Sequence, residues 1–74
     1  MTAAALLADV TAALLVAGVA ADVADGGSWA EVSLADPGQA DTLTAWLPAY
    51  GLALDSRWRS YGRLVLAVVR GVQP

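Results

Sequence analysis

Arg63-Leu64-Val65-Leu66-Ala67-Val68-Val69-Arg70 is the stretch that decides the fold of this chain. An apolar run rich in Val stands between two arginines, and it is too short for a typical helix. The run is apolar at both odd and even positions, which is typical of a strand covered on both faces. We therefore expect residues 63–70 to form the central strand of a small sheet.

Length and composition restrict the classes of protein that this chain can belong to. Its 74 residues predict a single domain, residues 1–74. A domain of this size buries only about 60% of its unfolded surface. The sequence contains no Cys and no His, so disulfides and metal sites built from these residues are excluded. Because 58% of the residues are hydrophobic, we expect association to supply the missing burial.

The first 24 residues are apolar and resemble a secretory signal in composition. They lack the positive n-region of such a signal, because no Lys or Arg precedes Arg57. Asp9 interrupts the apolar run, and the uncharged stretch from Val10 to Ala21 is too short to span a bilayer as a helix. We expect a helix of a cytoplasmic protein here, with no membrane partner.

Periodicity and turn residues predict the remaining elements. Ala and Leu at spacings of three and four favour helices, and alternation of apolar and polar residues favours strands. Gly18 and Gly51 stand where a left-handed residue ends a helix, and Pro48 is expected to loosen the last turn of the second one. We expect helices at 3–17 and 38–50, and further strands at 19–24, 29–34 and 52–58.

The second half of the chain repeats the first. A shift of 33 residues places Gly18 on Gly51, and it also aligns Asp22 with Asp55 and Val32 with Val65. We interpret this as an internal repeat of helix, strand and strand, covering residues 2–35 and 36–70.

The predicted fold class is α+β, a two-layer sandwich built from an αββαββ pseudo-repeat. Two hairpins join into a four-stranded antiparallel sheet with both helices on one face, a permuted ferredoxin-like plait. A right-handed crossover gives the strand order 52–58, 63–70, 29–34, 19–24. The alternative treats residues 3–24 as one continuous helix and leaves a three-stranded sheet.

No residue pattern indicates an enzyme. The serines have no His to activate them, and no phosphate-binding glycine loop precedes a helix. Asp22, Asp25 and Glu31 could gather around a divalent cation, but no calcium-loop pattern is present, so solvated carboxylates are the simpler interpretation. We expect no catalytic residue, no cofactor and no metal.

Charge is distributed unevenly along the chain. All seven acidic residues lie between Asp9 and Asp55, whereas the four arginines follow Asp55. In the segment 57–63 arginines alternate with aromatic residues. This suggests binding of an anion or nucleic acid through Arg57, Trp58, Arg59, Tyr61 and Arg63. The net charge of −3 argues against it, and arginines that flank a hydrophobic strand also protect it from aggregation.

The sheet face away from the helices carries the preferred functional hypothesis. If Leu64, Leu66 and Val68 face the helices, the opposite face presents Trp29, Val65, Ala67 and Val69. A two-layer fold leaves that face open to water. We expect a small protein-binding module, such as a structural subunit, adaptor or inhibitor of the kind phages and mobile elements encode. Its partner is a second copy in a homodimer or a larger protein, and nucleic acid is the alternative partner.

Overall fold

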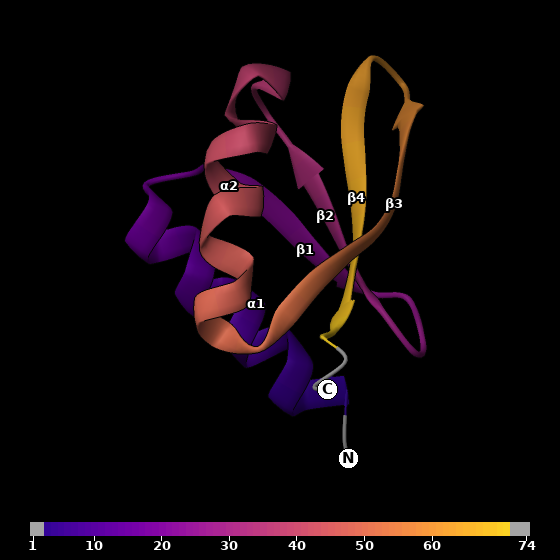
Figure 1. The fold of residues 1–74 in the computed structure, drawn as a ribbon. Helices are drawn as coiled ribbons and strands as arrows, with labels where there is room; N and C mark the ends of the chain where they lie inside the picture. Colours follow the sequence, from indigo (N-terminus) through magenta and orange to yellow (C-terminus); the bar gives the residue numbers. More distant parts are fainter. Residues whose placement is uncertain (1–2, 72–74) are drawn as a thin grey trace.

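The computed structural model describes residues 3–71 as two layers, one of helices and one of strands (Figure 1). The helical layer contains α1 and α2, with single-turn 3-10 helices η1 and η2 at the two ends of α2. The elements in chain order are α1 (Ala3–Ala17), β1 (Ala21–Asp25), β2 (Ala30–Leu34), η1 (Pro37–Gln39), α2 (Ala40–Trp46), η2 (Leu47–Tyr50), β3 (Leu52–Ser60) and β4 (Arg63–Arg70).

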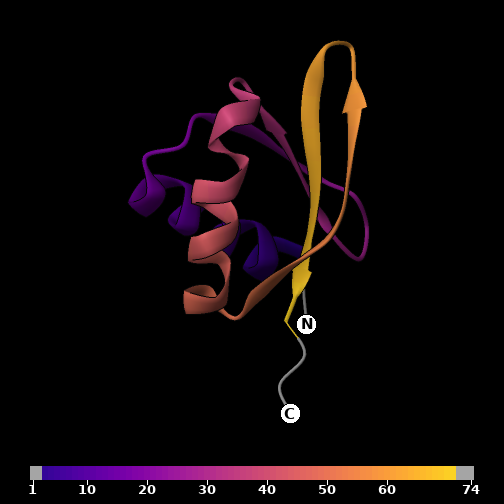
Figure 2. The same ribbon diagram turned by 45° about the horizontal axis from the view of Figure 1, so that its top comes forward.

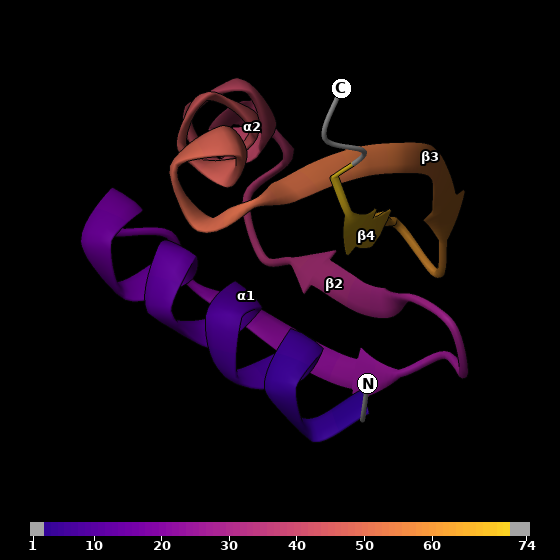
Figure 3. The ribbon, with the colours of Figure 1, turned by 60° about the horizontal axis from the view of Figure 1, so that its bottom comes forward.

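The four strands form one antiparallel sheet in the order β1-β2-β4-β3. Figure 3 shows α1 and α2 side by side on one side of this sheet. The predicted α+β class, the strand order and the central place of residues 63–70 are confirmed. The alternative of one helix over residues 3–24 is wrong, because α1 ends at Ala17 and β1 begins at Ala21.

Glycine and proline set the ends of the helices as their chemistry predicts. Gly18 and Gly51 have φ angles of 71° and 68°, a left-handed conformation that glycine adopts without a steric penalty. Asp36 opens η1, since its carboxylate accepts a hydrogen bond of 2.9 Å from the backbone N–H of Gly38. Pro48 lies in η2, after α2 has ended at Trp46. Thr2, a residue type that favours a helix N-cap, precedes α1 but lies outside the described residues.

The core fills the space between the helices and the inner face of the sheet. On α1 the spacing of three and four residues predicts one apolar side, and Leu6, Val10 and Leu14 on it are buried. In residues 38–50 the same spacing joins Leu43, Trp46 and Leu47, and it is only partly correct as a guide, because Leu43 and Leu47 are buried whereas Trp46 is exposed. The sheet contributes Ala30, Val32, Leu34, Leu52, Leu64, Leu66 and Val68.

A β-bulge in β3 changes which side chains face the helices. Leu54 lies opposite Val68, but the next paired residues are Ser56 and Ala67, so Asp55 is an extra residue. Because side chains alternate along a strand, the extra residue reverses the faces of everything that follows. The expected alternation of residues 52–58 is therefore wrong beyond Leu54.

The bulge also corrects the alignment of the two halves. Both halves have the predicted order of helix, strand and strand, with Gly18 and Gly51 at equivalent helix ends. After the bulge the offset becomes 34 residues, so Val32 corresponds to Leu66, which it directly faces in the sheet. The expected match of Val32 with Val65 fails because these side chains lie on opposite faces. That the halves superpose as a repeat stays a prediction.

Candidate functional site

The outer face of the sheet, which neither helix covers, is the first candidate site. The pairing of the strands arranges its side chains in rows across the sheet. One row runs Asp22, Ser33, Val65, Trp58, and the next runs Ala24, Glu31, Ala67, Ser56. A third row follows because Trp29 precedes Ala30, the partner of Val68. That row contains Trp29, Val69 and Ala53. The structure thus places the predicted Trp29, Val65, Ala67 and Val69 on one face.

Two of these four residues are nevertheless buried within the single chain. Val65 is 7% exposed and Ala67 only 3%, so the expectation that they form an open apolar strip is wrong. Both lie on β4 between β2 and β3, where Val65 is flanked by Trp58 and Ser33, and Ala67 by Glu31 and Ser56. The two residues form the floor of the outer face rather than its contact surface.

Trp29 is the most exposed of the four predicted residues, with 36% of its surface accessible to solvent. Its indole leans over the turn between β1 and β2, where a Cβ added to Gly26 would lie 2.2 Å from Nε1 of Trp29. Nε1 donates a hydrogen bond of 3.3 Å to the Glu31 carboxylate. Glycine at position 26 therefore makes room for the ring, and Glu31 orients it.

Trp58 is the contact residue of this face that sequence reasoning missed. It lies opposite Val65 and is 39% exposed. The bulge at Asp55 brings it to the outer face, whereas simple alternation assigned it to the helix side. Nothing in the sequence warned of this, because strict alternation places Arg57 outside and Trp58 inside, as in an ordinary half-buried strand.

Arg63 crosses the outer face toward β1. One of its terminal nitrogens donates a hydrogen bond of 3.0 Å to the backbone carbonyl of Ser33 and lies 3.4 Å from the Asp22 carboxylate. Arg63 is thus engaged in linking three strands. It forms one polar border of the face that carries Trp29 and Trp58.

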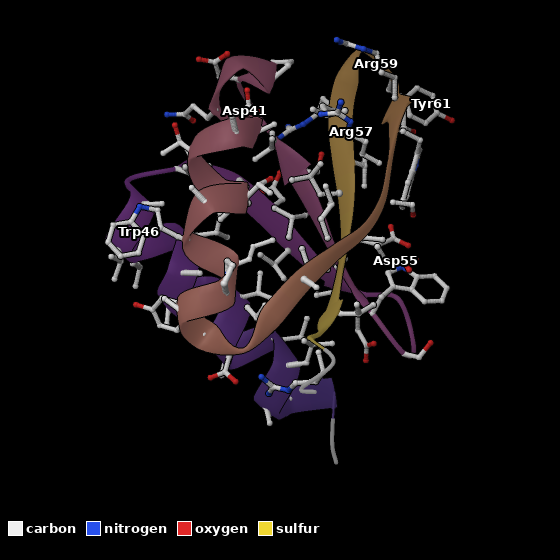
Figure 4. All side chains as sticks on the ribbon, viewed as in Figure 1. Asp41, Trp46, Asp55, Arg57, Arg59 and Tyr61 are labelled. Carbon is white, nitrogen blue, oxygen red and sulfur yellow. The ribbon has the colours of Figure 1, made fainter. Side chains whose placement is uncertain are left out.

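The second candidate site is the opposite face of the β3–β4 hairpin, whose tip extends past the end of β2 (Figure 2). Arg57 and Arg59 lie on the helix side, since they pair with Leu66 and Leu64. Figure 4 shows Arg57 pointing toward the start of α2, where Asp41 lies. These residues line a hollow of about 460 Å³. Within residues 3–71 neither arginine forms an ion pair or a side-chain hydrogen bond.

The predicted Arg and aromatic segment does not form one surface. Arg57 and Arg59 face the helices, whereas Trp58 faces the other way. Tyr61 lies at the hairpin tip, fully exposed and with a φ of 51°. Arg63 is already held by Asp22 and Ser33. A ligand on either face of the hairpin therefore meets only part of the predicted set.

The described part of the chain offers little for metal binding. No group of three or more metal-ligating side chains occurs within residues 3–71. Over the same residues, neither helix combines the length and the apolar character needed to cross a bilayer.

Comparison with known proteins adds no functional information. No family model, no curated protein and no solved structure matches this chain.

Proposed function

We propose that this chain is a small, non-enzymatic protein-binding module that uses the outer face of its sheet. The observation that carries the proposal is the pair Trp29 and Trp58, each more than one third exposed on a face with a buried floor of Val65 and Ala67. Tryptophan is enriched among the residues that anchor protein interfaces, because its side chain buries much apolar area for little loss of conformational entropy.

The spacing of the two indoles suggests the chemistry of the partner. Trp58 lies beside residue 65 and Trp29 beside residue 69, so they are offset by four residues, or about 13 Å, along β4. They also lie on opposite sides of β4, which separates their strands by about 10 Å. Ala67 lies between them, and Ser56 and Glu31 flank it. The face therefore suits an apolar side chain that enters between the indoles. A basic group beside that side chain would meet Glu31.

The proposal can be tested by crosslinking followed by a matched substitution. A photoreactive residue at position 58 should capture a specific protein, whereas the same residue at position 46 should not. Trp46 is the matched control, because it is 41% exposed but lies on α2. With the purified partner, Trp58→Ala should weaken binding by about 2 kcal/mol or more, roughly thirtyfold. Equal losses for Trp58→Ala and Trp46→Ala would contradict the proposal.

Nucleic acid or another polyanion is the second candidate ligand, at the hollow of Arg57 and Arg59. The supporting observation is that both guanidinium groups lack a partner within residues 3–71. Two phosphate contacts to a single strand give a slope of only about −1.4 in a plot of log affinity against log salt. Replacing both arginines by Ala should abolish that slope, and no binding to oligonucleotides at low salt would remove this candidate.

A further inference from the structure

The open edge of β1 is a surface that the proposed function does not use. β1 and β3 are the two edge strands of the sheet. β3 carries a bulge at Asp55 and two exposed arginines, Arg57 and Arg59, features that hinder pairing with another strand. β1 pairs with β2 over all five residues without a bulge. Its far side is thus a regular edge.

The hydrogen bonds around β1 identify the backbone groups that point outward. Ala20 accepts a hydrogen bond from Ala35, and Gly26 donates one to Trp29. In an antiparallel pair, bonded positions recur at every second residue, so Asp22 and Ala24 also bond to β2. The N–H and C=O groups of Ala21, Val23 and Asp25 therefore point to the open edge.

From this alternation of inward and outward backbone groups we infer that a second copy of the chain pairs with β1 about a two-fold axis through Val23. In this register Val23 faces Val23 of the other copy, and Ala21 faces Asp25. Every outward backbone group of one β1 then meets an outward group of the other, which gives six hydrogen bonds in all. An axis through Asp22 or Ala24 would also bring outward groups together, but it would leave one of the three outward residues of β1 unpaired, so Val23 is the centre that pairs the whole strand.

The side chains on both faces fit the same register. On the outer face Asp22 would lie opposite Ala24, so no two carboxylates face each other directly, and Arg63 already neutralises Asp22. On the helix side Val23 meets its own copy, which is favourable for β-branched residues. The register thus pairs the outward backbone groups and keeps the carboxylates of the two strands from facing each other directly.

A neighbouring apolar surface on α1 adds to this edge. A hollow of about 470 Å³ lies between the C-terminal half of α1 and β1, lined by Leu14, Leu15 and Val23 among others. Leu15 lines this hollow and is 77% exposed. Pairing of the strands would bring the two α1 helices together on one side of a joint sheet. The exposed residues Ala4, Ala8 and Thr11 are small enough for close approach of the helices.

The dimer would leave the proposed binding face of each copy accessible, so it would carry two such faces. Two sheets of four strands would join into one, with both outer faces on the same side. Trp29 and Trp58 of each copy stay accessible, so the dimer presents two binding faces to a repetitive or dimeric partner. Such bivalency raises the overall affinity without a new contact.

Sedimentation equilibrium of three chains tests the inference. Wild type should dimerise. Val23→Lys, which sets two like charges face to face at the axis, should raise the dimer dissociation constant by more than about tenfold. Val69→Lys makes the same change on the outer face and should alter the dimer dissociation constant by less than about twofold. A wild type that stays monomeric at millimolar concentration overturns the inference, and so does a dimer that Val69→Lys disrupts and Val23→Lys does not.

Hydrogen exchange provides a second measurement in case Val23→Lys fails to fold. In dilute wild-type protein the amide of Val23 should exchange freely, and it should become protected as the protein concentration rises and the dimer forms. The amide of Asp22, bonded to β2, should be protected throughout. Free exchange at Val23 under conditions where the dimer predominates would overturn the inference.

Discussion

Trp58 of β3 lies directly opposite Val65 of β4 on the face of the sheet that the helices leave uncovered. The pairing depends on the extra residue Asp55, which turns Trp58 outward and Arg57 inward. Val65 becomes buried, and Trp58 becomes a contact residue of the outer face. One inserted residue therefore determines the character of both faces of the hairpin.

Charges placed at Val65 and Val69 should have different effects. Val69 is only partly buried, so Val69→Asp should leave the fold intact and weaken partner binding. Val65 is buried, and the neighbouring Arg63 on the same face is already held by Asp22 and Ser33, so Val65→Asp should cost several kcal/mol of unfolding free energy. Urea unfolding of both variants measures the difference. Equal stability of the two would show that the outer face is more open than the structure has it.

The left-handed glycines at the helix ends should be sensitive to any side chain. Gly51→Ala meets no atom within 4 Å, so its cost comes from the φ of 68° alone. We expect a loss of about 1 to 2 kcal/mol in the free energy of unfolding. Gly18→Ala, at φ 71° and equally uncrowded, should cost about the same. A large difference between the two variants would contradict the equivalence of the two helix ends.

The indole of Trp29 should move when its place over Gly26 is filled. In Gly26→Ala the new methyl group would lie within 3 Å of three atoms of the ring. The ring must therefore rotate away and lose its hydrogen bond to Glu31. In an ¹H–¹⁵N NMR spectrum the indole signal of Trp29 should shift, while those of Trp46 and Trp58 should not. An unchanged Trp29 signal would disprove the described packing.

Much of the fold could be predicted from the sequence because its signals are local. The apolar run 63–70 and the stops at Gly18 and Gly51 each depend on a few neighbouring residues, and the structure agrees with them. The bulge could not be predicted, because Asp55 continues an alternating pattern and nothing nearby marks it as extra. The extra residue becomes apparent only in the pairing of β3 with β4, where Asp55 has no partner.

The candidate site could be predicted only in part for the same reason. Trp29 and Val69 lie on the outer face as predicted, because β2 and β4 pair without a bulge. Simple alternation along these two strands therefore assigns the faces correctly. Whether Val65 and Ala67 are exposed depends on side chains across the sheet, and these follow from the register rather than from local pattern. Arg63 was expected to be available, but its partners Asp22 and Ser33 lie far away in the sequence.

The three tryptophan indole signals of the chain give the most direct test of the proposed binding face. Two of the rings, Trp29 and Trp58, lie on the outer face, and Trp46 lies on α2 as an internal control of similar exposure. The purified partner, obtained by crosslinking at position 58 of the full chain, is titrated into ¹⁵N-labelled protein. Our account predicts that the signals of Trp29 and Trp58 shift or broaden together while that of Trp46 stays in place. Movement of the Trp46 signal with the other two unchanged would contradict it.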